Sequence, residues 1–172
     1  AQIEEMFKVG AHFGYSRARR HSSVKGHLYG AKNGADIINL EDTQRMLAVA
    51  KARMVELGKL GKVVLFVGTK DEVRGIVESV AHSMNAPYVN ERWVGGMLTN
   101  WNEIKKRIAR LKDLSDKFAK GDLGKYTKKE RLLFEREMAK LHAEFGGVSS
   151  LEGIPGAIVI VDPRAEHIAV TE

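Results

Sequence analysis

The residues that most resemble a chemical site follow Val63 to Val67, a run of five apolar residues typical of a buried strand. Gly68, Thr69 and Lys70 come directly after this run, where nucleotide-binding folds place a phosphate loop. Such a loop needs a glycine-rich turn, with a lysine and a hydroxyl at fixed spacing. Neither that spacing nor the glycine fingerprint of a dinucleotide site is present. The segment therefore predicts a tight turn that uses Gly68 for its backbone freedom. A nucleotide-using α/β enzyme with an unrecognised phosphate loop remains the alternative.

The sequence offers few other groups for catalysis or metal binding. It contains no cysteine, which excludes thiol nucleophiles, disulfides and cysteine-based metal sites. No two histidines have the spacing of a metal-binding pair on a helix, and no nucleophile elbow is present. We therefore expect no enzyme activity, no metal and no cofactor. The six histidines are His12, His21, His27, His82, His142 and His167.

The positive charge of the chain is concentrated near its beginning. The formal net charge is +6, and the stretch from Met6 to Ala35 contains six Lys and Arg but no Asp or Glu. A solvated loop normally mixes both signs, whereas an acid-free stretch with hydroxyls and Tyr15 is typical of phosphate contacts. This stretch therefore predicts an RNA-binding surface. The candidate residues are Arg17, Arg19, Arg20, Lys25 and Lys32.

A second unusual segment, NERWVGGMLTNW, extends from Asn90 to Trp101. In an RNA interface Trp93 could stack on a base, Arg92 could bind a phosphate, and Asn100 could supply amide contacts. The alternative is that the tryptophans attach neighbouring helices to the body of the protein. We favour that structural role for Trp101 and leave both roles open for Trp93.

Strand and helix patterns alternate along most of the chain, which predicts an α/β fold with a mostly parallel sheet. Strands are expected at Asp36 to Leu40, Val63 to Val67, Pro87 to Asn90 and Ala157 to Val161. Helices are expected from Thr43 to a C-cap at Gly58 and from Asp71 to Met84.

Between the third and fourth strands, apolar residues recur every three or four positions in two stretches, from Trp101 to Phe118 and from Phe134 to Phe145. Thr127 and Glu130 form a capping-box signature at the start of the second helix. We predict a protruding antiparallel coiled-coil hairpin at 99–145, inserted into an α/β body at 1–98 and 146–172. The alternative is that the two stretches are ordinary core helices. The tip near Asp122 should tolerate change, whereas the base of the hairpin should contact RNA. The candidate residues at the base are Lys105, Lys106, Arg107 and Arg110.

The composition is that of an ordinary globular protein, with 44% hydrophobic and 29% charged residues. No apolar run is long enough to cross a bilayer, and no signal segment begins the chain. We therefore expect a cytoplasmic protein that does not associate with membranes.

Several segments together resemble the bacterial family of small-subunit ribosomal protein S2, and they span nearly the whole chain in the family's order. The block around Gly95 and Gly96 is the most specific of them. The segments are Phe7 to Gly14 (FKVGAHFG), Gly30 to Thr43 (GAKNGADIINLEDT), Leu65 to Lys70 (LFVGTK), Val89 to Trp101 (VNERWVGGMLTNW), Gly153 to Asp162 (GIPGAIVIVD) and Glu166 to Val170 (EHIAV).

The resemblance implies a flavodoxin-like parallel sheet flanked by helices, with the protruding helical hairpin of the bacterial and organellar branch. It also implies a structural role in the small ribosomal subunit, with binding to 16S-type rRNA and help in recruiting ribosomal protein S1. Catalysis is not implied. Family members continue beyond the position of Glu172, so we expect the C-terminal part of the family fold to be absent from this chain.

Overall fold

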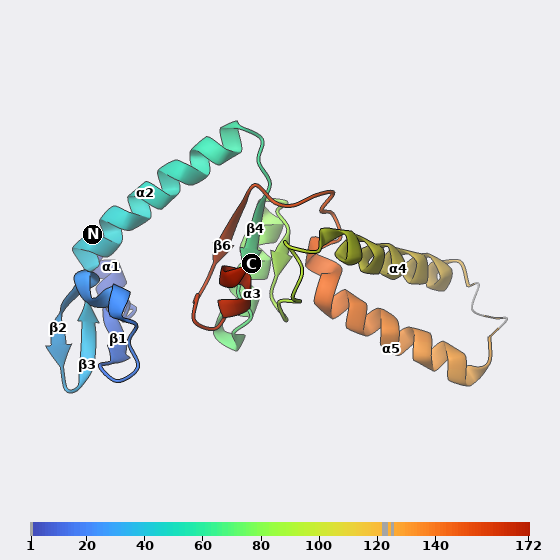
Figure 1. The fold of residues 1–172 in the computed structure, drawn as a ribbon, viewed down its shortest axis with the longest axis horizontal. Coiled ribbons are helices and arrows are strands. Elements are labelled where there is room, and N and C mark those ends of the chain that lie inside the picture. Colours follow the sequence, from blue (N-terminus) through green and yellow to red (C-terminus); the bar gives the residue numbers. More distant parts are fainter. Residues whose placement is uncertain (1, 122–123, 125) are drawn as a thin grey trace. The chain divides into compact units, whose positions relative to one another are not determined.

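The computed structural model describes residues 2–121, 124 and 126–172. The chain divides into two compact units, Ala1–Leu60 and Gly61–Glu172, which we call the N-terminal unit and the C-terminal unit (Figure 1). Across the described residues, no helix has the length and apolar character needed to cross a membrane. The division of the chain into a body and an inserted hairpin remains a prediction.

The N-terminal unit contains a small antiparallel sheet with strand order β1-β3-β2. Its elements are α1 (Gln2–Lys8), β1 (Phe13–Ser16), the 3-10 helix η1 (Ser22–His27), β2 (Leu28–Lys32), β3 (Ala35–Ile38) and α2 (Leu40–Lys59).

The strand expected at Asp36 to Leu40 exists as β3, but its expected place in the parallel sheet is wrong. Asn33 and Gly34 both have positive φ angles, of 52° and 79°, and form the two-residue turn between β2 and β3. Such a turn joins antiparallel neighbours, because its twist matches that of the two strands. β3 therefore pairs antiparallel with both β2 and β1.

Helix α2 is longer at both ends than the sequence pattern indicated. The side chain of Asn39 accepts hydrogen bonds from the backbone N–H groups of Glu41 and Asp42, so the helix begins at Leu40 rather than near Thr43. The expected C-cap at Gly58 is also wrong, because α2 continues to Lys59. The residue with a positive φ after the helix is Gly61, at 64°.

The C-terminal unit contains a parallel sheet flanked by helices, as expected, with strand order β5-β4-β6. Its elements are β4 (Val64–Val67), α3 (Asp71–Ser83), β5 (Tyr88–Val89), α4 (Trp101–Ala119), α5 (Lys128–Phe145), the 3-10 helix η3 (Gly146–Val148), β6 (Ala157–Ile160) and α6 (His167–Thr171).

The two apolar strands of this sheet are less completely buried than their sequences suggested. In the central strand β4, Leu65 and Val67 are almost fully buried, whereas Val64 and Phe66 on the other face are half-buried. Every residue of β6 is half-buried, because β6 is an edge strand that pairs only with β4. Only one face of β4 is therefore fully buried, and no residue of β6 is.

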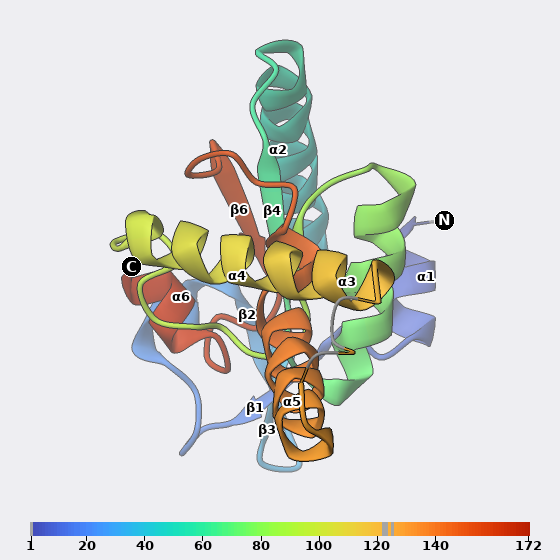
Figure 2. The same cartoon turned by 90° about the vertical axis from the view of Figure 1, so that its right-hand side faces the viewer.

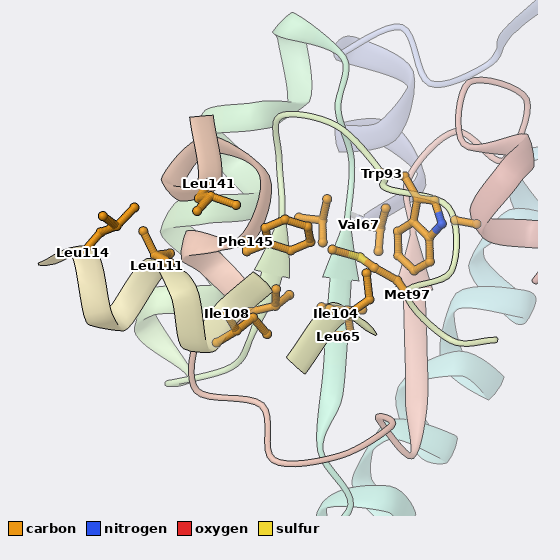
Figure 3. Close-up of a cluster of buried hydrophobic side chains, with 13 residues drawn as sticks. Leu65, Val67, Trp93, Met97, Ile104, Ile108, Leu111, Leu114, Leu141 and Phe145 are labelled. Carbon is orange, nitrogen blue, oxygen red and sulfur yellow. The ribbon is translucent and has the colours of Figure 1, made fainter. Parts of the chain in front are cut away.

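The hydrophobic core lies on the face of β4 that presents Leu65 and Val67 (Figure 3). Phe145, at the end of α5, is fully buried there, and Ile104 and Ile108 from the start of α4 join it. The same cluster continues outward along α4 to Leu111 and Leu114 and includes Leu141 of α5. The two long helices are therefore attached to the sheet at one end by apolar packing.

Helices α4 and α5 begin and end close to where the sequence placed them. The capping box at Thr127 is confirmed: the Thr127 N–H donates to the Glu130 carboxylate at 2.8 Å, and the Glu130 N–H donates to Thr127 Oγ1 at 3.3 Å. α5 ends at Phe145, directly before Gly146 and Gly147. In Figure 1 the two helices lie close together beside the sheet and farther apart at the end of α4 and the start of α5, and in Figure 2 they run in clearly different directions. The expected tip residue Asp122 lies outside the described residues.

Gly68 forms the predicted tight turn after β4, but for a different physical reason. Its φ angle is not positive, so backbone freedom does not explain the glycine. A Cβ at this position would lie 2.8 Å from Val73 Cγ1 and 3.1 Å from Val77 Cγ2. Gly68 is therefore needed because α3 approaches the end of β4 too closely for a side chain.

Replacing Gly68 with Ala should lower the free energy of unfolding of the C-terminal unit by about 1–3 kcal/mol, because the new methyl group overpacks the turn. The matched control is Gly75→Ala in α3, where a Cβ would meet nothing within 4 Å. That change should be neutral or stabilise the helix by up to about 1 kcal/mol. Urea unfolding of the variants measures both, and equal stabilities would contradict the packing argument.

Candidate RNA interface

The acid-free segment folds into the exposed loops and strands of the N-terminal unit. Arg17 directly follows β1, Lys25 lies in η1, and Lys32 ends β2. All three side chains are exposed, and within the described residues none of them forms an ion pair. Arg19 is also exposed. These four cations remain placed where an anionic partner could reach them.

Arg20 has a different environment from its neighbours. Its guanidinium donates to both carboxylate oxygens of Asp36, at 3.1 and 3.2 Å. Asp36 is only 1% exposed, and a buried carboxylate without a partner would be costly. Arg20 therefore neutralises a buried acid of β3, and its contact with an RNA phosphate remains a prediction.

Ionic contacts also fix the end of η1 to the start of α2. His27 Nδ1 contacts the Asp42 carboxylate, which Arg45 contacts as well. Hydrogen bonding to His27, and then to Arg45, lowers the pKa of Asp42 below its ordinary value. The loop that presents Lys25 is therefore held at its C-terminal end.

The four cations expected at the base of the hairpin separate into two kinds. Lys105 and Arg107 are exposed and, among the described residues, have no ionic partner. Lys106 pairs with Glu103 at 2.6 Å on the same helix. Arg110 forms more extensive contacts, described next.

Arg110 joins α4 to α5. Its Nε and one terminal nitrogen donate to the Glu137 carboxylate at 2.9 and 3.0 Å, and its guanidinium carbon lies 5.9 Å from the centre of the Phe134 ring. Hydrogen bonding to Glu137 raises the pKa of Arg110, and the same contact lowers the pKa of Glu137. Arg110 therefore bridges the two helices, and its contact with RNA remains a prediction.

The segment from Asn90 to Trp101 also contains both buried structural side chains and exposed polar ones. Trp93 is 5% exposed and belongs to the core beside Met97 and Val67, so no face of its ring is open to a base (Figure 3). Trp101 begins α4 and packs against the same cluster, as expected. Arg92 and Asn100 are exposed. The structural interpretation therefore applies to both tryptophans.

Two carboxylates that the sequence reading passed over hold the loops at the end of the sheet. Glu166, 3% exposed, accepts from the Thr69 N–H at 2.8 Å and from Thr69 Oγ1 at 2.6 Å. Glu172 accepts from the N–H groups of Gly96 at 2.5 Å and Leu98 at 3.0 Å. Neither acid could be found from motif spacing, because each partner lies more than 70 residues away in the chain.

The Glu166 contact bears directly on nucleotide binding. The amide and hydroxyl of Thr69 are the groups that a phosphate after β4 would need, and a carboxylate already occupies them. Lys70 pairs with Asp162, and this contact is the main reason that the pKa of Asp162 is lowered. In the loop after β4, where nucleotide folds bind phosphate, the carboxylates of Glu166 and Asp162 contact Thr69 and Lys70.

A hollow of about 560 Å³ lies between α3, β5 and α5 within the C-terminal unit. Its lining includes Glu78, Glu91 and Glu144, which disfavour an anion. The Tyr88 hydroxyl donates to Glu78 at 3.2 Å. Burial is the main cause that raises the pKa of Tyr88, and the negative charge of Glu78 is the second.

Across the described residues, no cluster of His, Asp and Glu has the arrangement of a metal site.

Comparison with known proteins agrees with the sequence motifs. The sequence pattern of the ribosomal protein S2 family matches residues 6–172. The chain is 40% identical over 170 residues to the small ribosomal subunit protein uS2 of Picosynechococcus, covering 99% of this chain and 66% of that protein. It is 39% identical to the protein of the same name from Geotalea uraniireducens, with the same coverage, and 41% identical to that of Vibrio cholerae, of which it covers 70%.

These similarities place the chain among ribosomal proteins. It belongs to the ribosomal protein S2 family, which confirms the resemblance of its motifs. The chain spans about two thirds of the length of the curated relatives that it matches.

Replacing Arg110 with Gln should lower the free energy of unfolding by up to about 1 kcal/mol near pH 7, as expected for a partly exposed pair. The pKa of Glu137 is lowered in the folded state, so its contribution is complete above the ordinary carboxyl value and is lost as the pH falls through the lowered one. The stability difference between wild type and variant should therefore shrink as the pH falls from about 7 toward about 3.

Denaturant unfolding at several pH values measures that difference. Lys106→Gln, which removes the exposed pair with Glu103, is the control and should have a smaller effect. A difference for Arg110→Gln that stays constant into acid would show that the bridge to Glu137 does not stabilise the two helices.

Proposed function

We propose that this chain is a non-catalytic structural constituent of the small ribosomal subunit that binds 16S-type rRNA through its N-terminal unit. The observation that supports this most strongly is the acid-free segment, in which Arg17, Lys25 and Lys32 are exposed and have no ionic partner among the described residues. Membership of the S2 family gives the partner its class. Localisation in the cytoplasm, on the ribosome of a bacterium or an organelle, is part of the proposal.

The chemistry of the contact is phosphate binding. Cations that bind phosphates release condensed counterions, so affinity falls steeply as the salt concentration rises. Arg17 can bind a phosphate through two parallel N–H bonds, whereas Lys25 and Lys32 act as point charges. Because the exposed cations lie in a segment without acids, a polyanion meets no like charge within it.

The C-terminal unit supplies a second contact in this proposal. Lys105 and Arg107 lie near the start of α4, close in sequence to the exposed Arg92 and Asn100. We propose that these residues bind rRNA at the base of a protruding α4–α5 coiled-coil hairpin, inserted into a flavodoxin-like body. The outer faces of the helices would meet neighbouring small-subunit proteins, and the whole would help to recruit ribosomal protein S1.

The test is a triple replacement of Arg17, Lys25 and Lys32 by Gln. It should weaken binding to structured small-subunit rRNA and reduce the slope of log affinity against log salt by about two to three, because up to three phosphate contacts are removed. Fluorescence anisotropy titrations at four salt concentrations give both quantities.

The matched control replaces Lys51, Lys59 and Lys62 by Gln, three exposed lysines outside the acid-free segment. It makes the same change in net charge and should leave the salt slope nearly unchanged. If the two triple variants bind alike, the segment is only a solvated surface, and the proposed RNA interface is wrong.

A further inference from the structure

Three aromatic rings form a continuous stack in the N-terminal unit. The rings of Phe7 and His12 are nearly parallel, with centroids 4.2 Å apart and an interplanar angle of 11°. The rings of His12 and Phe13 follow, with centroids 4.1 Å apart and an angle of 37°. We call this arrangement the aromatic column.

The chain builds the aromatic column with a tight turn at the end of α1. Gly10 has a φ of 77°, in the left-handed region that favours glycine. The Ala11 N–H donates to Met6 O at 2.9 Å, and the Phe13 N–H donates to Gly10 O at 3.1 Å. The turn returns the chain over the helix end, so that the His12 ring lies between the rings of Phe7, five residues earlier, and Phe13, the next residue.

The aromatic column is attached to the sheet rather than to a free loop. The backbone oxygen of His12 accepts from the Ile38 N–H at 2.8 Å, and Phe13 begins β1 opposite Ile37 of β3. A ring held by a strand and by a second ring has little conformational freedom to lose on binding. The arrangement is therefore organised before a ligand arrives.

Both ends of the aromatic column are open. Phe7 is 59% exposed and Phe13 is 66% exposed, whereas His12 between them is half-buried. An exposed phenylalanine that is already ordered by stacking offers a flat apolar surface, and flat aromatic surfaces are the platforms on which nucleic-acid bases stack.

The exposed Lys32, and the lack of acids in the segment that carries Phe13, favour a polyanionic partner over an apolar protein surface. Phe13 lies opposite Ile37, and Lys32 lies opposite Ala35, two positions along β3, so both side chains belong to the same face of the sheet. No Asp or Glu occurs between Met6 and Ala35. A base on Phe13 would thus place its own phosphates near exposed cations.

We propose that Phe13 stacks on an unpaired base of RNA, extending the aromatic column by one ring, while Lys32 binds a neighbouring phosphate. This inference rests on the proposed function and narrows its substrate to RNA with unpaired bases. Duplex RNA cannot satisfy it, because paired bases are stacked on each other and only ends, loops and bulges expose a base face. The cations set the affinity for phosphate, and Phe13 selects the unpaired segment.

The test compares two RNA probes of equal length and charge, a hairpin with an unpaired purine loop and a fully paired duplex, with the full chain. Phe13→Leu keeps apolar volume and removes the ring. It should weaken hairpin binding roughly 5- to 150-fold, the range expected for one stacked base. Duplex affinity and the salt slope should not change, since no phosphate contact is removed.

Two further variants separate stacking from folding. Phe13→Tyr keeps an aromatic ring and should bind the hairpin like wild type. If only the apolar volume of Phe13 mattered, Phe13→Leu would bind as well as Phe13→Tyr. Val9→Ala changes a residue that is 81% exposed in the same turn and makes no ring contact among the described residues; it should bind like wild type. In wild type, 2-aminopurine in the loop should lose fluorescence on binding.

Failure of the inference can be distinguished from failure of the proposed function. If Phe13→Leu binds the hairpin like wild type while the Arg17, Lys25 and Lys32 variant does not, RNA binding stands and stacking is wrong. If Phe13→Leu keeps RNA affinity but no longer associates with small subunits, Phe13 contacts a protein and the inference is overturned. If wild type binds neither probe, both proposals fail.

Discussion

The C-terminal unit depends on the packing of helices against one face of β4. Leu65 and Val67 are almost completely buried there, and Phe145, Ile104 and Val148 are buried against the same face. Removing a buried aromatic ring such as that of Phe145 would cost about 3–5 kcal/mol. α4 and α5 also contact each other directly, and the Arg110–Glu137 bridge is one of these contacts.

Some cations of the chain form ion pairs with its own acids, whereas others are exposed and could bind an anionic partner. Arg20, Arg110 and Lys106 each neutralise an acid of the chain, whereas Arg17, Lys25, Lys32, Lys105 and Arg107 have no ionic partner within the described part. Glu166 binds the backbone amide of Thr69 in the loop after β4, where a nucleotide fold would bind phosphate. Glu172 binds the backbone amides of Gly96 and Leu98, in the segment between β5 and α4. The groups of Thr69 that could bind a phosphate are therefore occupied by an acid of the chain itself, although the net charge of the chain is +6.

Local patterns in the sequence predicted local structure well. The three-and-four spacing from Trp101 onward predicted α4, and Thr127 with Glu130 predicted the start of α5. The pairing of strands from different parts of the chain was harder to predict from the sequence. The turn at Asn33 and Gly34 places β3 in an antiparallel sheet. These two residues are the only local indication of a hairpin, whereas the alternating strands and helices of the rest of the chain predicted a parallel sheet.

The sequence predicted the positive charge of the candidate site but not which of its side chains contact other parts of the chain. Composition alone identified the acid-free segment, because opposite charges can be counted without coordinates. It could not reveal that Asp36 binds Arg20 from 16 residues away, or that Trp93 is buried in the core. The aromatic column was missed for a related reason: FKVGAHFG has no helical or strand periodicity, and its rings meet only because Gly10 reverses the chain.

The central claim, that this chain is a small-subunit constituent held by rRNA phosphates, is tested most directly by co-sedimentation. Purified chain would be mixed with small ribosomal subunits that lack their own S2 protein and separated on sucrose gradients at roughly 0.1 M and 1 M salt, where screening differs severalfold. We predict about one copy per subunit at the lower salt and dissociation at the higher. A chain that stays at the top of the gradient at both salts, or that binds large subunits equally well, would contradict the account.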